Sequence, residues 1–132
     1  MRVLKEKSVS IRLVPADFEK LEAQARRRFS KAASIGSVIV SHQLRRLDHP
    51  AIDFHDLPEG GFVARLAGRR VSVWLVAKTS KQCGTVAKTA VALDLPESLV
   101  VAALGYAAEY PEEIAADTER GERRLRDRKS VV

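Results

Sequence analysis

Hydrophobic and polar residues alternate strictly between Lys7 and Leu13, and this pattern predicts a half-buried β-strand. One side of the strand is polar and the other apolar: Ser8, Ser10 and Arg12 against Val9, Ile11 and Leu13. Residues 1 to 47 contain no second strand pattern, so the backbone groups of this strand have no partner in the same segment. We therefore expect two copies of the chain to pair these strands antiparallel. The polar residues would then be displayed twice on the outer face of a two-stranded ribbon.

Two helices are predicted after this strand. Pro15 suits the first turn of a helix, and an apolar stripe follows it: Phe18, Leu21, Ala25 and Phe29. A second helix, capped by Ser30 or Ser34, should end before Pro50, because a proline excludes the residue before it from helical geometry. Its apolar surface is broken by His42 and is too wide to be buried on one side only. The residues of this surface are Ile35, Val38, Ile39, Leu44 and Leu47.

The middle of the chain predicts a β-hairpin and three short helices. Apolar-rich segments flank a turn at Pro58-Glu59-Gly60-Gly61, which is typical of short strands. Gly84 should end a helix that opens at Trp74, Thr85 should cap the next, and Pro96 should begin the third. The last two helices have the spacing of a helix-turn-helix. The predicted fold class is α+β, mainly α.

Charge is distributed unevenly and suggests three segments. Residues 1–47 carry a net charge of +7, residues 48–118 carry −4 and residues 119–132 carry +3. A basic head followed by a mildly acidic middle favours contact between the head and a polyanion. We place the segments at 1–48, 49–118 and 119–132.

Composition excludes several classes of protein. With 45% hydrophobic residues the chain is not disordered, and no stretch is long and apolar enough for a membrane helix. The first residues show no signal-peptide pattern, so we expect a cytoplasmic protein. One cysteine, Cys83, and three scattered histidines make a structural metal improbable, and we expect no metal and no cofactor. Asp53, His55 and Asp56 are close in sequence, but no further residue completes a site, so we expect no enzyme.

The predicted helix-turn-helix could itself read DNA, but its second helix is poorly suited to this role. It presents no Arg, Lys, Asn or Gln to base edges, and the segment around it is net acidic. Packing and dimer contact are the preferred uses of these helices.

Residues 7–47 resemble a ribbon-helix-helix DNA-binding domain, on the pattern Ser-Val-Ser-Ile-Arg-Leu followed by Pro15. The resemblance implies that a ribbon enters the major groove of operator DNA and that Ser8, Ser10 and Arg12 read the bases. It also implies that the start of the second helix, around Ser30 and Lys31, contacts phosphate, as the free amides of a helix N-terminus allow.

Residues 49–118 resemble a small winged-helix-like domain of undefined function found in bacterial antitoxins. The residues that carry this resemblance are His49-Pro50, Gly68, Val73-Trp74, Leu93-Asp94-Leu95-Pro96 and the segment 103–110. Together the two halves resemble a VapB-like type II antitoxin. Such a protein neutralises a PIN-type ribonuclease toxin and represses its own operon by binding DNA as a dimer. The alternative is a stand-alone dimeric transcriptional repressor with no toxin partner. Whether two dimers join further is left open.

Residues 119–132 are mostly charged, and they predict either a loose solvated helix or a segment that orders on a partner. If that partner is a nuclease with a carboxylate metal site, an inserted arginine can pair with the carboxylates bidentately. The candidate partner-binding residues are Arg120, Arg123, Arg124 and Arg126, with Arg123 and Arg124 preferred. A competing hypothesis is that these arginines add nonspecific affinity for DNA.

Overall fold

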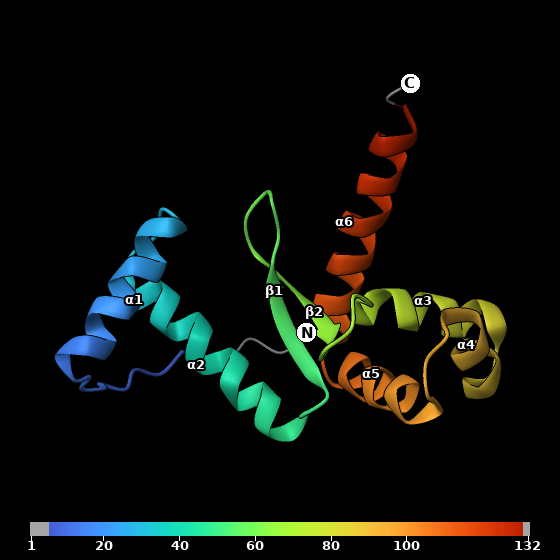
Figure 1. Ribbon diagram of the computed structural model, residues 1–132, viewed down its shortest axis with the longest axis horizontal. Coiled ribbons are helices and arrows are strands. Elements are labelled where there is room, and N and C mark those ends of the chain that lie inside the picture. Colours follow the sequence, from blue (N-terminus) through green and yellow to red (C-terminus); the bar gives the residue numbers. More distant parts are fainter. Residues whose placement is uncertain (1–5, 131–132) are drawn as a thin grey trace. The chain divides into compact units, whose positions relative to one another are not determined.

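A computed structural model describes residues 6–130, and within them the chain forms helices and one two-stranded sheet (Figure 1). The elements, in order, are α1 (Pro15–Arg27), α2 (Ala32–Asp48), β1 (Ile52–Asp56), β2 (Phe62–Leu66), α3 (Val73–Cys83), α4 (Val86–Leu93), α5 (Glu97–Glu109) and α6 (Pro111–Ser130). This order confirms an α+β fold that is mainly α. The chain divides into two compact units, residues 1–40 and residues 41–132. The division therefore lies inside α2, whereas the charge pattern placed it at the end of that helix.

The first unit buries very little. Only Ala25 and Ile35 are buried among its described apolar residues, with exposed fractions of 4% and 6%. Helix α1 ends at Arg27, where Phe29 takes a left-handed conformation with φ of 51°. The Ser30 N–H then donates to the Ala25 carbonyl at 2.9 Å, which closes the helix end. Phe29 is 99% exposed, so its predicted place in the stripe of the first helix is wrong: the left-handed turn takes it off the helix.

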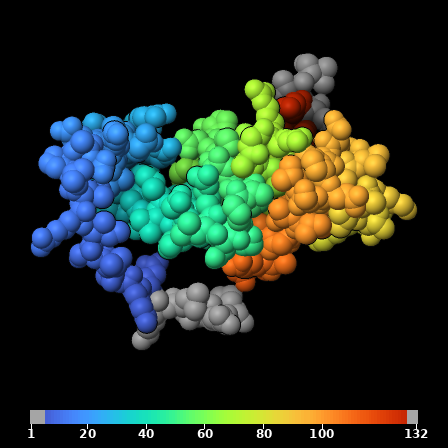
Figure 2. Space-filling view, turned by 60° about the horizontal axis from the view of Figure 1, so that its bottom comes forward, coloured from blue at the N-terminus to red at the C-terminus, as the bar shows by residue number. Residues whose placement is uncertain are grey.

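The predicted strand over residues 7–13 is not formed as a strand. Residues 6–14 carry no regular secondary structure, and every one of them is exposed. The segment projects from the first unit as a single length of chain (Figure 2, dark blue). A β-strand is defined by hydrogen bonds to a neighbouring strand, and the described part of this unit contains no such neighbour. The missing ladder is the expected state of one isolated copy.

A β-hairpin opens the second unit. Strands β1 and β2 pair antiparallel, with Ile52 opposite Leu66 and Phe54 opposite Ala64. The turn between them uses Gly60 and Gly61, whose φ angles of 98° and 84° are left-handed. A single bridge between Arg65 and Ser72 follows the hairpin. One face of the hairpin contributes to a core shared with α3 and α5. The largest fully buried side chains there are Tyr106, Ile52, Leu66, Val73, Val76, Val100 and Thr89.

Helices α3, α4 and α5 begin and end close to the predicted residues. Gly84 ends α3 with a φ of 86°, and the Thr85 hydroxyl accepts from the Lys88 N–H at 3.1 Å to cap α4. Asp94 takes a left-handed conformation after α4, and α5 starts directly after Pro96. Helices α4 and α5 are bent by 109° relative to each other. Within residues 6–130 no single helix is long and apolar enough to cross a membrane, although α4 and α5 taken together pass that test of length and composition.

Helix α6 is one continuous helix of 20 residues. The predicted segment boundary between residues 118 and 119 therefore lies inside a helix, which residues 119–130 continue. The helix is fixed by its first half, where Ile114 is buried in the core. Its second half and the turn of the hairpin extend from the core in the same direction (Figure 1). This places the arginines of α6 beside the hairpin.

Candidate functional site

The three predicted base-reading residues lie on the exposed segment before α1. Ser8, Ser10 and Arg12 are all exposed and alternate with Val9, Ile11 and Leu13. The apolar side chains are also exposed, at 79%, 58% and 42% respectively. Exposing a continuous apolar row of this kind is unfavourable in water, and such rows mark interaction surfaces. The polar residues and the apolar residues that alternate with them are thus all solvent-accessible, and Val9 and Ile11 are the most exposed of the apolar ones.

The same unit exposes further large apolar side chains on its helices. Phe18 of α1 is 46% exposed, and Ile39 and Val40 of α2 are 47% and 39% exposed. At about 25 cal/mol per Å², covering these side chains would supply several kcal/mol per copy. A unit of some 40 residues with two buried apolar side chains needs such a contribution to be stable.

The predicted phosphate-contacting residues lie between α1 and α2. Ser30 and Lys31 are both exposed, and the first intrahelical hydrogen bond of α2 runs from the Ile35 N–H to the Lys31 carbonyl at 3.1 Å. Lys31 therefore occupies the cap position, and Ser34 lies inside the helix rather than capping it. The amides of the first turn have no acceptor within the helix, and a lysine stands next to them.

Helix α6 holds the four predicted partner-binding arginines, and three of them already have carboxylate partners. Arg120 pairs with Asp117 and Arg123 with Glu119 along the helix, and Arg124 pairs with Glu59 of the hairpin turn. Within residues 6–130, Arg126 forms no ion pair and its side chain is exposed. Arg123 and Arg124, the residues that the sequence favours, are thus both paired. By geometry, Arg126 is the most available charge of the four.

Burial and charge act differently on two of these carboxyl groups. Burial raises the pKa of Asp117, whose side chain is 4% exposed, and the Arg120 guanidinium opposes that rise. The pKa of Glu59 is lowered, by its own backbone hydrogen bond and then by Arg124. Glu59 therefore stays ionised near neutral pH and holds the turn of the hairpin against α6.

A network between α2, α5 and α6 was not predicted from the sequence. The Tyr106 hydroxyl donates to the Glu113 carboxylate at 2.5 Å and accepts from Arg45 Nη1 at 2.9 Å. Arg45 also pairs with Glu113 and lies over the Tyr110 ring, 4.2 Å from its centroid. His49 Nε2 lies 2.7 Å from a Glu109 carboxylate oxygen. A signal for this network exists in the sequence, because Arg45 in the last turn of α2 and His49, directly after the helix, are four residues apart and so fall on the same side of the chain.

The histidine that breaks the apolar surface of α2 is part of an aromatic cluster. The His42 ring stacks on Phe54 of β1 with centroids 3.9 Å apart and planes within 5°, and it meets the edge of Phe62 at 4.8 Å. Burial, followed by the positive charge of Arg45, lowers the pKa of His42. The His42 side chain thus packs α2 against the hairpin.

Among residues 6–130 no group of three or more histidine, cysteine or acidic side chains is placed to hold a metal ion. Asp53, His55 and Asp56 stay on one strand, where the Asp53 carboxylate accepts from the Phe54 N–H at 2.9 Å. Comparison of the chain with protein-family models, with curated proteins and with solved structures finds no match.

Proposed function

We propose that this protein is the antitoxin of a type II toxin-antitoxin pair, which binds operator DNA as a dimer through residues 7–47 and a PIN-type ribonuclease through the second unit and α6. The observation that carries the DNA-binding part is the segment from Ser8 to Leu13, in which polar and apolar residues alternate and all are exposed. Two copies paired antiparallel would satisfy the backbone and cover the apolar rows. Their outer face would present hydroxyls and arginines suited to the major groove.

The second unit fits the proposed function as a protein-binding domain. A hairpin followed by α3, α4 and α5 is compatible with a winged-helix-like domain, but the exposed residues of α5 carry no cation or amide for base edges. Helix α6 presents the arginines on one continuous helix, and within residues 6–130 Arg126 forms no ion pair. A nuclease that binds its metal through carboxylates presents the acceptors that a guanidinium fork matches best.

The first test is binding to the DNA immediately upstream of the protein's own gene, measured at several salt concentrations. We expect the wild-type chain to bind specifically, with an affinity that falls as salt rises. Changing Ser10 and Arg12 together to alanine should abolish specific binding. Arg126→Ala is the control, since it also removes one positive charge but lies outside the ribbon. Equal binding by wild type and the double variant would refute the ribbon as the DNA-reading element.

The toxin part requires its own test, and the structure shows how to design it. Deleting residues 119–132 would uncover Trp74, which packs against Gly121, so a loss of partner after truncation would be ambiguous. Point substitutions avoid this difficulty. Arg126→Ala should weaken binding to a co-expressed PIN-type nuclease and release its activity, while DNA binding stays intact. A protein that represses its own promoter but binds no such nuclease, with or without the substitution, would be the stand-alone repressor.

A further inference from the structure

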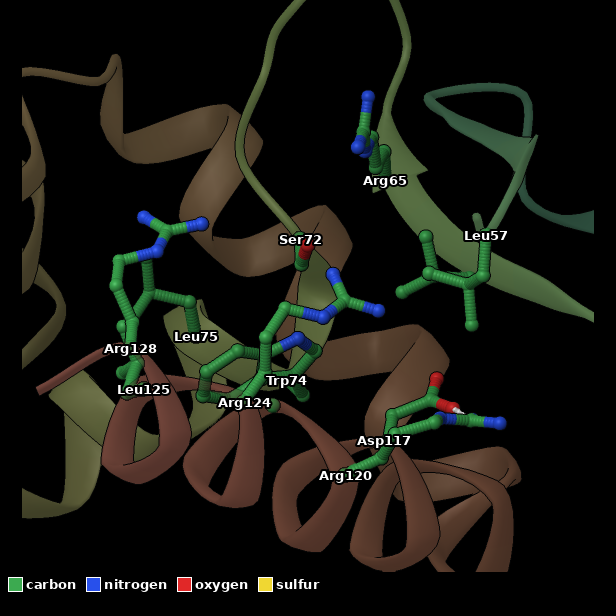
Figure 3. Close-up of a pocket in the computed structure, with 12 residues that line it drawn as sticks. Leu57, Arg65, Ser72, Trp74, Leu75, Asp117, Arg120, Arg124, Leu125 and Arg128 are labelled. Carbon is green, nitrogen blue, oxygen red and sulfur yellow. Dashed lines mark hydrogen bonds and ion pairs between the residues drawn. The ribbon is translucent and has the colours of Figure 1, made fainter. Parts of the chain in front are cut away.

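A cleft of about 260 Å³ lies within the second unit, between the hairpin, the start of α3 and the outer half of α6. Its walls are partly apolar, with Val63, Trp74 and Leu125 among the lining residues. Figure 3 shows Arg65 on the hairpin side and Arg120, Arg124 and Arg128 on the α6 side, around the indole of Trp74. The cleft is smaller than the pockets that hold drug-sized ligands, so its size suits a small molecule.

Positive charge exceeds negative charge in this cleft. Four arginines line it, whereas two carboxylates lie at or beside it: Asp117, paired with Arg120, and Glu59, paired with Arg124. Within residues 6–130, Arg65 and Arg128 form no ion pair. Two guanidinium groups from different elements therefore face a partly apolar cleft without a counter-charge.

Arg65 is the cleft residue that most clearly lacks a hydrogen-bond acceptor. Its Nε is buried and has no hydrogen-bond acceptor, and it is the only such side-chain atom among the described residues. A buried donor without an acceptor is destabilising by about 1–3 kcal/mol, and by more where the group is charged. Folding would not favour a guanidinium at this place unless an acceptor reaches it in the working protein. An oxyanion supplies two acceptor atoms in the geometry that a guanidinium fork accepts.

We infer that this cleft binds a small organic oxyanion, a carboxylate or phosphate on an apolar or aromatic body. The anionic group contacts Arg65 and Arg124, and the body lies against Trp74. Because Glu59 already occupies Arg124, the ligand competes with that carboxylate for the guanidinium. Binding therefore loosens the contact between the hairpin turn and α6. The cleft shares Arg120 and Arg124 with the candidate toxin-binding arginines of α6, whereas the segment proposed to read DNA, Ser8 to Leu13, is not part of it.

Trp74 is the only tryptophan in the chain, so its fluorescence reports on this cleft alone. The experiment titrates the full chain with phenyl phosphate and, separately, benzoate, at an ionic strength held constant with sodium chloride. We expect a saturable change in Trp74 fluorescence. Arg65→Met should raise the apparent Kd at least tenfold. Glu59→Gln should lower it several-fold, because it frees Arg124.

Arg126→Gln is the matched control: it removes a positive charge from the same helix at a residue that does not line the cleft, and it should leave the Kd unchanged. The gain of affinity in Glu59→Gln guards against misfolding, since a damaged cleft cannot bind more tightly. A fluorescence change that does not saturate, or one that Arg65→Met and Arg126→Gln share equally, would overturn the inference. Saturable binding by inorganic phosphate with the same Kd as phenyl phosphate would overturn the role given to the apolar wall.

Discussion

The indole of Trp74 lies against the backbone of Gly121, in the outer half of α6. A Cβ added at Gly121 would overlap the six-membered ring of Trp74, whereas a Cβ added at Gly105, in α5, would meet nothing. Glycine lowers the stability of a helix interior, and here the absence of a side chain lets α6 approach α3 closely. The contact holds the arginines of α6 over the cleft.

Gly121→Ala should therefore destabilise the second unit in spite of alanine's higher helix propensity. Overpacking of this kind is destabilising by about 1–3 kcal/mol. Urea unfolding followed by circular dichroism would measure the loss, and the fluorescence of Trp74 should shift to longer wavelength as the indole becomes wetter. Gly105→Ala is the control, expected to stabilise by up to about 1 kcal/mol. Equal effects of the two substitutions would show that the helix contact does not form.

Tyr106 should make stability sensitive to alkaline pH. Burial, followed by the hydrogen bond and charge of Glu113, raises the pKa of its hydroxyl well above the ordinary value of 10.0. Above about pH 10 the unfolded chain loses this proton while the folded chain keeps it, so the free energy of unfolding should fall as pH rises. Tyr106→Phe should reduce this fall, leaving the smaller part due to Tyr110, whose pKa burial and the charge of Glu109 also raise. At neutral pH the substitution should lower stability by about 1–2 kcal/mol through the lost hydrogen bonds. Urea midpoints between pH 8 and about 11 test both expectations.

His42 should make the free energy of unfolding fall at acidic pH, as the pH decreases. Because burial and Arg45 lower its pKa in the folded state, the unfolded chain takes up a proton first as the pH falls below the ordinary value of 6.5. The contribution of His42 to stability is thus present above that pH and is lost as the pH falls through the folded-state pKa. His42→Phe should flatten the dependence of stability on pH. His55→Gln, in β1 of the hairpin, leaves the stack of His42 on Phe54 in place and should leave that dependence unchanged. Unfolding midpoints between about pH 5 and 7.5 measure the difference.

The row of apolar residues before α1 makes a prediction about self-association. Ile11→Asp would place a charge on the side that we expect to be covered by a second copy, and the protein should become monomeric in analytical ultracentrifugation. Ser10→Asp adds the same charge one residue away, on the polar side, and should remain dimeric while losing affinity for DNA. A dimer that survives Ile11→Asp would contradict the proposed pairing of the two segments.

The sequence by itself determined the features that depend on neighbours a few residues apart. Gly84 ends α3 because it tolerates a positive φ, Thr85 caps α4 with its own hydroxyl, and Pro50 follows the end of α2 closely. Each of these effects is decided within one or two turns of chain, so the pattern of residue types was sufficient. The separation of polar and apolar side chains from Ser8 to Leu13 is likewise visible in the sequence.

Only the tertiary structure decided which arginines form ion pairs and which do not. Arg123, Arg124 and Arg126 look alike in the sequence, but Arg124 is paired with Glu59, 65 residues away, and Arg126 is unpaired within residues 6–130. The cleft beside Trp74 also depends on Gly121, which is far along the chain. The stacking of His42 on Phe54 likewise depends on β1, the strand that follows α2. Such relationships arise because packing brings distant segments within a few ångströms, and no local pattern of residue types specifies which segments meet.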